Sequence, residues 1–154
     1  MRRLWRDGYG TLSIPGGGHH RTAAVDNPGE PVDNPAPLTI PLEIAASYRA
    51  RTRGLLGRDG IDGALLLTPA SGVHTLGMRF PIDVAHLDRD LMVLSVCTMR
   101  PGRLGRIRLR SRHVLEAEAG AMERWGLRPG VHVTVTQAVP AFGTAPRPGG
   151  TMGS

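Results

Sequence analysis

The sequence is short of several residue types: it has one cysteine, no lysine and few aromatic residues. The single Cys97 excludes an internal disulfide and a structural zinc site built on cysteines. Because Cys97 lies in the apolar run 91–99, we expect a buried, unreactive thiol. No stretch reaches the ~18 apolar residues of a membrane helix, and the first residues lack the apolar segment of a secretion signal. We therefore expect a cytoplasmic protein without a membrane segment.

All positive side-chain charge apart from histidine comes from arginine, and the formal net charge is +6. Arginine suits bidentate pairing with carboxylates and phosphates. Arginines are most frequent between Arg100 and Arg112, and those that alternate there are candidates for an anion-binding row: Arg106, Arg108, Arg110 and Arg112. With aromatic residues at 4% of the chain, no platform for stacking bases is visible, which argues against nucleic acid. The simpler interpretation is a solvated strand edge that charge protects from pairing.

Composition divides the chain into four parts. Residues 1–18 contain an N-terminal strand at 9–14, and residues 19–37 form a flexible insertion rich in proline and glycine. Residues 38–139 form the β-rich domain, and residues 140–154 a disordered tail. Residues 38–44 alternate apolar and polar side chains as a half-buried strand does, and should pair with 9–14 in a hairpin. Pro41 favours an edge position for this strand.

The remaining elements are short. Ser47 can cap a helix over 48–56 that ends at Gly57, and a second helical turn is predicted at 121–125. The clearest hairpin joins 82–88 to 91–99 through a turn at 88–90. Other extended segments are expected at 64–67, 73–79, 106–110, 113–117 and 131–135. These patterns predict a mainly β fold, a small antiparallel β-sandwich or jelly-roll-like domain with two short helices.

Asp83 is the first candidate for a site. Alternation places it on one face with Ala85 and Leu87, so an inward face would bury its carboxylate. A buried carboxylate has to be paired, hydrogen-bonded or protonated. Arg53 or Arg79 can supply a bidentate partner. The structural interpretation is that Asp83 ties the helix-and-glycine element to the sheet, through such a pair or through backbone N–H groups. The functional interpretation is that Asp83 faces a ligand.

His74 precedes Asp83 by nine residues and can be a metal ligand or proton carrier beside it. Such a site also needs Glu116 or His113 from another strand, and the spacing carries no ligand geometry. Met78 fits an ordinary core pattern or an apolar pocket. No phosphate loop, dinucleotide fingerprint or nucleophile elbow is present, so no cofactor is expected.

Three separated stretches resemble one family. They are residues 53–58 (RGLLGR), residues 74–84 (HTLGMRFPIDV), and residues 114–116 (VLE) followed by Gly120 and residues 126–130 (GLRPG). Their order resembles the domain of unknown function 192 family, also called uncharacterised protein family 0127, and the likeness spans about two thirds of the chain. The resemblance implies a β-rich sandwich with short packed helices and implies no reaction. The chain departs from the family pattern at Leu76, at His86 and in the 19–37 insertion.

Two classes of function fit these observations. The preferred hypothesis is a non-enzymatic domain that binds a small ligand or a protein partner; its candidate pocket residues are His74, Met78, Asp83, Glu116 and Arg53. The alternative is a metal-assisted enzyme in which His74, Asp83 and Glu116 converge. Anion binding through the arginines of 100–112 is the third.

Overall fold

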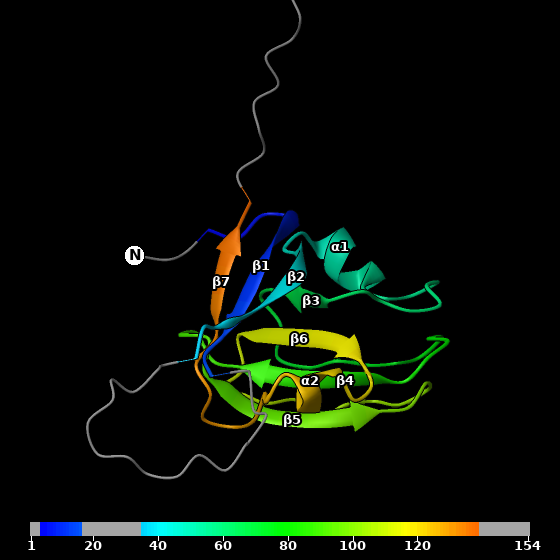
Figure 1. The fold of residues 1–154 in the computed structure, drawn as a ribbon. Helices are drawn as coiled ribbons and strands as arrows, with labels where there is room; N and C mark the ends of the chain where they lie inside the picture. Colours follow the sequence, from blue (N-terminus) through cyan, green and yellow to red (C-terminus); the bar gives the residue numbers. More distant parts are fainter. Residues whose placement is uncertain (1–3, 17–34, 139–154) are drawn as a thin grey trace, which may run out of the picture.

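Seven strands form one β-sheet in the computed structural model, which describes residues 4–16 and 35–138 (Figure 1). The strands are β1 Gly8–Ile14, β2 Leu38–Ala45, β3 Ala64–Leu67, β4 Ile82–Leu87, β5 Val93–Met99, β6 His113–Glu118 and β7 Thr134–Gln137. Their order in the sheet is β5-β4-β6-β3-β2-β1-β7. All neighbours are antiparallel except β2 and β3. The prediction of a mainly β fold with two short helices is confirmed.

The predicted hairpin of the first two strands is present, with Ile14 opposite Leu38. The expectation that Pro41 lies in an edge strand is wrong, because β2 runs between β1 and β3. Pairing with β3 begins only at Leu42. The residue next to Pro41 on the β3 side is Gly63, which precedes β3. A side chain at Gly63 would collide with the Pro41 carbonyl oxygen. The proline is therefore tolerated just before the ladder starts.

The sheet is strongly curled, and β1, β2 and β7 run at a steep angle to β4, β5 and β6 (Figure 1). Its concave side holds one apolar core to which all seven strands contribute, including Leu12, Leu66 and Leu115. The segment before β7 reaches the start of β5, where Val133 N donates to Leu91 O over 3.1 Å. These bonds bring the two edges together without closing the sheet. They also explain why β7 begins at Thr134 and not at the predicted residue 131.

A second apolar cluster covers the convex side of the sheet, built on Leu65, Val84 and Val114. Helix α1 (Tyr48–Arg53) and the loops around it pack over this cluster, and Ser47 caps the helix by accepting from Ala50 N over 3.2 Å. The sequence predicted that this helix would continue to residue 56. It ends at Arg53 because Gly54, with φ of 45°, reverses the chain there.

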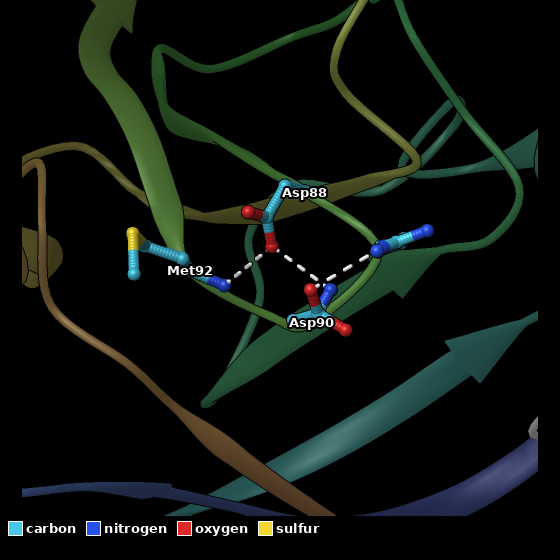
Figure 2. A network of polar contacts seen from close by, with 4 residues as sticks. Asp88, Asp90 and Met92 are labelled. Carbon is cyan, nitrogen blue, oxygen red and sulfur yellow. Dashed lines mark hydrogen bonds and ion pairs between the residues drawn. The ribbon is translucent and has the colours of Figure 1, made fainter.

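The turn of the β4–β5 hairpin depends on one side chain (Figure 2). Asp88 Oδ1 accepts from Asp90 N over 2.9 Å and from Met92 N over 3.0 Å. Such local bonds are the reason aspartate favours turns. The predicted hairpin at 82–99 is present, with β5 starting at Val93 after this turn.

Two predicted extended segments are irregular loops. Residues 73–79 form no strand beyond a single bridge from His74 to Leu104. Residues 106–110 form no strand either, and Ile107 and Leu109 are 72% and 85% exposed where alternation would bury one face. The loops bond to each other instead, for example from Gly105 N to Val73 O over 2.8 Å. The arginines there therefore share no strand face.

Most of the predicted insertion at 19–37 and all of the predicted tail at 140–154 lie outside the described residues. The second helix, α2 (Ala121–Arg124), lies where the second helical turn was predicted. Neither α1 nor α2, the helices of the part of the chain described, is long and apolar enough to cross a membrane.

Candidate functional site

The pairing of β4 with β6 decides which predicted site residues can meet. Asp83 is opposite Ala117, and Glu116 is opposite Val84. Side chains alternate along a strand, so Asp83 faces the concave core while Glu116 faces the convex side. The sheet itself separates the two carboxyl groups. The metal-assisted hypothesis needs them together, and within residues 4–16 and 35–138 no three His, Cys, Asp or Glu side chains form a metal-ligand group.

Asp83 is 3% exposed and fully hydrogen-bonded. Its Oδ1 accepts from Thr98 Oγ1 over 2.7 Å, and its Oδ2 accepts from Met122 N over 3.1 Å. The carboxylate thus joins β4 to β5 and to the first turn of α2. Neither Arg53 nor Arg79 pairs with it, and Arg79 donates to Asp59 over 2.9 Å. Asp83 therefore holds elements together, but it joins β4 to β5 and α2 and not to the helix-and-glycine element at 48–57, and Thr98 and Met122 take the place of the predicted arginines.

Glu116 has the same 3% exposure but no bonding partner within the described part of the chain. Burial raises the pKa of its carboxyl to about 7. The carboxyl lies beneath the end of α1. Its Oε2 is 4.0 Å from the position that a Cβ atom would take if Gly54 were replaced by a larger residue. Any larger residue at position 54 would narrow the space above the acid.

A pocket of about 80 Å³ opens above Glu116. Its polar lining includes Arg53 and His74, and Met78 and Leu67 contribute apolar surface. The structure therefore brings four of the candidate residues to one pocket and leaves Asp83 outside it. Strand spacing alone gives no signal for this, since β6 enters from a distant part of the sequence.

A wider cleft of about 970 Å³ lies on the other side of α1 and shares lining residues with the Glu116 pocket: Thr52, Arg53, Gly54 and Leu56. It contains an ion pair, in which Arg58 donates to both carboxylate oxygens of Glu43 over 2.8 Å. The hydrogen bonds from Arg58 lower the pKa of Glu43. Sequence analysis did not identify this cleft, whose walls come from β1, β2 and α1.

The predicted arginine row is divided by the loop. Arg106 and Arg108 line a groove of about 640 Å³ beside β5, whereas Arg110 and Arg112 do not. Arg112 donates to the carbonyl oxygens of Leu109 and Ser111 over 2.9 and 3.0 Å. Cys97 also lines the groove and is exposed, so the expected burial of its thiol is wrong. It lies near the end of an edge strand, where an apolar run does not ensure burial.

His86 forms the inner wall of that groove and is 2% exposed. Its Nδ1 lies 3.3 Å from Ser95 Oγ, and its Nε2 is buried without a partner. Burial, and then the charge of Arg108, lowers the pKa of the imidazole. Sequence reasoning did not propose His86 as a site residue. The available signal was its departure from the family pattern.

The geometry defines a small, curled β-sheet domain with recesses on its convex side. Comparison with known proteins assigns the family of this domain. The protein-family model for domain of unknown function 192, described as "Uncharacterized ACR", matches residues 32–135. The chain belongs to this family. No curated protein matches it.

Two solved structures share the fold. A "putative transcription regulator" from Sinorhizobium meliloti 1021 has a TM-score of 0.63 at 17% identity, covering 86% of this chain and 98% of that one. A protein of unknown function from Novosphingobium aromaticivorans DSM 12444 has a TM-score of 0.57 at 16% identity, covering 80% of this chain and 83% of that one. At such identities the likeness concerns the fold alone.

Proposed function

We propose that this protein is a non-enzymatic binding domain whose ligand occupies the Glu116 pocket. The observation that carries the proposal is a nearly fully buried carboxyl group that faces a pocket and has no partner within the part of the chain described. Buried polar groups are almost always hydrogen-bonded, because an unsatisfied one costs free energy. The oxygens of Glu116 are not among the fully enclosed atoms without a partner, so they are open to the pocket, and a ligand that donates to them supplies the missing hydrogen bond.

The size and lining of the pocket define the ligand class. A volume of about 80 Å³ admits a group the size of two or three water molecules, each of which occupies about 30 Å³ in the liquid. Glu116 accepts hydrogen bonds at the base, and Met78 and Leu67 exclude water around it. The inserted group is therefore a small hydrogen-bond donor, an amine or a primary amide. The rest of the ligand extends to the polar rim at His74 and Arg53.

The placement of Asp83 favours binding over the metal-assisted reaction. Its two oxygens already accept hydrogen bonds on the far side of the sheet. Glu116 and His74 thus have no second carboxylate to complete a set of ligands. A single buried acid next to a rim histidine suits recognition of a donor group.

The test uses methylammonium and acetamide as probes of the intact protein. Both are titrated while amide NMR signals of Gly54 and His74 and the side-chain carboxyl carbon of Glu116 are followed. We expect saturable shifts of these signals with at least one probe. In Glu116→Gln the affinity should fall at least tenfold, about the effect of one hydrogen bond to a charged group.

Glu118→Gln is the matched control, because Glu118 lies two residues further along β6 and is exposed. It should bind the probes as the unmodified protein does. An equal loss of probe affinity in both variants would contradict the proposal, and so would the absence of a saturable shift with either probe. An equal affinity in Glu116→Gln would contradict it as well.

A further inference from the structure

The second recess, the groove beside β5, is strongly cationic. In the described part of the chain no carboxylate lines it, whereas four arginines do: Arg100, Arg103, Arg106 and Arg108. None of their guanidinium groups has a hydrogen bond or ion pair within residues 4–16 and 35–138. Unpaired like charges gathered in a recess repel one another, and an anion relieves that repulsion.

The loop that carries these arginines is held in place over the sheet. The buried Thr75 Oγ1 donates to Arg100 O over 2.6 Å and accepts from Arg103 N over 2.9 Å. Gly105 packs so closely on Val73 that a side chain there would collide with it. The groove is therefore formed before any ligand arrives, which reduces the ordering cost of binding.

His86 supplies an observation that is independent of the arginines. It comes from β4 and lines the groove, and its Nε2 is buried without a partner. When Nδ1 accepts from the hydroxyl of Ser95, the neutral ring carries its proton on Nε2. This N–H is then a donor without a partner on a residue that lines the groove together with the arginines.

We propose that this groove binds the phosphate group of a small phosphorylated molecule, with His86 Nε2–H and the guanidinium groups of Arg106 and Arg108 as donors. A phosphate monoester presents three acceptor oxygens and up to two negative charges, which matches several arginines better than one carboxylate does. Met99 and Leu104 provide apolar surface for the remainder of the molecule. Among the described residues, no phenylalanine, tyrosine or tryptophan lines the groove, so a stacked nucleic-acid strand is disfavoured.

This phosphate site is separate from the Glu116 pocket. The two recesses share no lining residue. Either can therefore bind or fail to bind without deciding the other.

The experiment titrates glycerol 3-phosphate and inorganic phosphate into the intact protein by calorimetry, at low and at 150 mM salt. The nitrogen NMR signal of His86 Nε2 is followed in parallel. We expect saturable binding of glycerol 3-phosphate with a shift of the Nε2 signal. The double variant Arg106→Ala, Arg108→Ala should weaken binding at least tenfold, and His86→Phe several-fold.

The double variant Arg110→Ala, Arg112→Ala removes the same charge outside the groove and should keep the original affinity. Equal weakening by both double variants would show binding to net charge alone and overturn the proposal. Failure of both phosphates to saturate, or an unmoved Nε2 signal, would also overturn it. Inorganic phosphate that binds as tightly as the ester would overturn the assignment to a phosphorylated molecule, because Met99 and Leu104 would then make no contact with the rest of it. A single-stranded oligonucleotide that binds far more tightly than the ester would overturn the small-ligand assignment.

Discussion

Buried polar side chains on the two faces of the sheet differ in how completely they are hydrogen-bonded. On the concave side, Asp83 has two donors, and His113 Nδ1 lies 2.7 Å from Thr68 Oγ1. On the convex side, Glu116 has no partner among residues 4–16 and 35–138, and His86 keeps its Nε2 unpaired. All four are less than a tenth exposed, so burial does not distinguish them. The two residues with completed hydrogen bonds join elements of the fold, and the two with incomplete bonding lie in the recesses that we propose as ligand sites.

Strands β4 and β6 each supply one residue to each face: Asp83 and His86 from β4, and His113 and Glu116 from β6. The convex residues lie under loops, whereas the concave ones lie inside the curl of the sheet. Loops that leave gaps over a sheet form recesses more easily than a continuous strand layer does. The comparison predicts opposite consequences for changes on the two sides.

The largest expected effect comes from Asp83→Ala. It removes two hydrogen bonds to a charged group and leaves the donors of Thr98 and Met122 without their acceptor. We expect the free energy of unfolding to fall by about 4 kcal/mol, measured by urea denaturation. As a control, Asp59→Ala should change it by less than about 0.5 kcal/mol, because its ion pair with Arg79 is exposed. A loss below about 1 kcal/mol in Asp83→Ala would remove the distinction between the faces.

A smaller effect is expected for Glu116 and depends on pH. The pKa of its carboxyl is about 7 in the folded state against an ordinary 4.5, so between these values the folded protein keeps a proton that the unfolded chain has released. Stability due to this group is therefore complete below about pH 4.5 and is lost as pH rises through 7. Between pH 5 and 8 the unmodified protein should lose about 2 to 3 kcal/mol relative to Glu116→Gln.

Urea midpoints at both pH values measure this difference, and the other titrating groups cancel between the two proteins. Glu118→Gln should show the same pH slope as the unmodified protein. A parallel pH dependence in Glu116→Gln would mean that the carboxyl is satisfied in the folded state.

The smallest effect, and the one of opposite sign, is predicted for His86→Phe. The change removes the unpaired Nε2 and places an apolar ring against the convex cluster. Replacing an unsatisfied polar atom by apolar surface should raise the free energy of unfolding by about 1 kcal/mol. The same change at His113, whose Nδ1 is paired, should lower it. Thermal unfolding of both variants, converted with the measured unfolding enthalpy, decides between these signs.

Much of the fold was predictable because alternation and turn residues are local signals. The hairpin around Asp88, the apolar strand β3 and the cap at Ser47 all follow from a few neighbouring residues. The strand predicted at 106–110 is wrong because its alternation is between arginine and exposed apolar side chains, and no strand of residues 4–16 and 35–138 pairs with it. Pairing partners are a property of the whole sheet, which a local pattern does not contain.

The candidate site was predictable only in part, for the same reason. The sequence singled out His74, Met78 and Glu116, which line one pocket. It also grouped Asp83 with them, because the face on which Asp83 lies relative to Glu116 depends on the register between β4 and β6. A shift of one residue in that register would have placed both on one side.

The neighbourhood of β1 and β7 has a consequence for chain connectivity. The two strands run antiparallel, and Ala138 N donates to Tyr9 O over 2.8 Å, so the end of β7 adjoins the start of β1 as in a hairpin. A short linker between them, with the chain opened between β1 and β2, would preserve every strand pair of the sheet. The domain is thus suited to circular permutation, and the order of its strands along the chain is one of several that the same sheet permits.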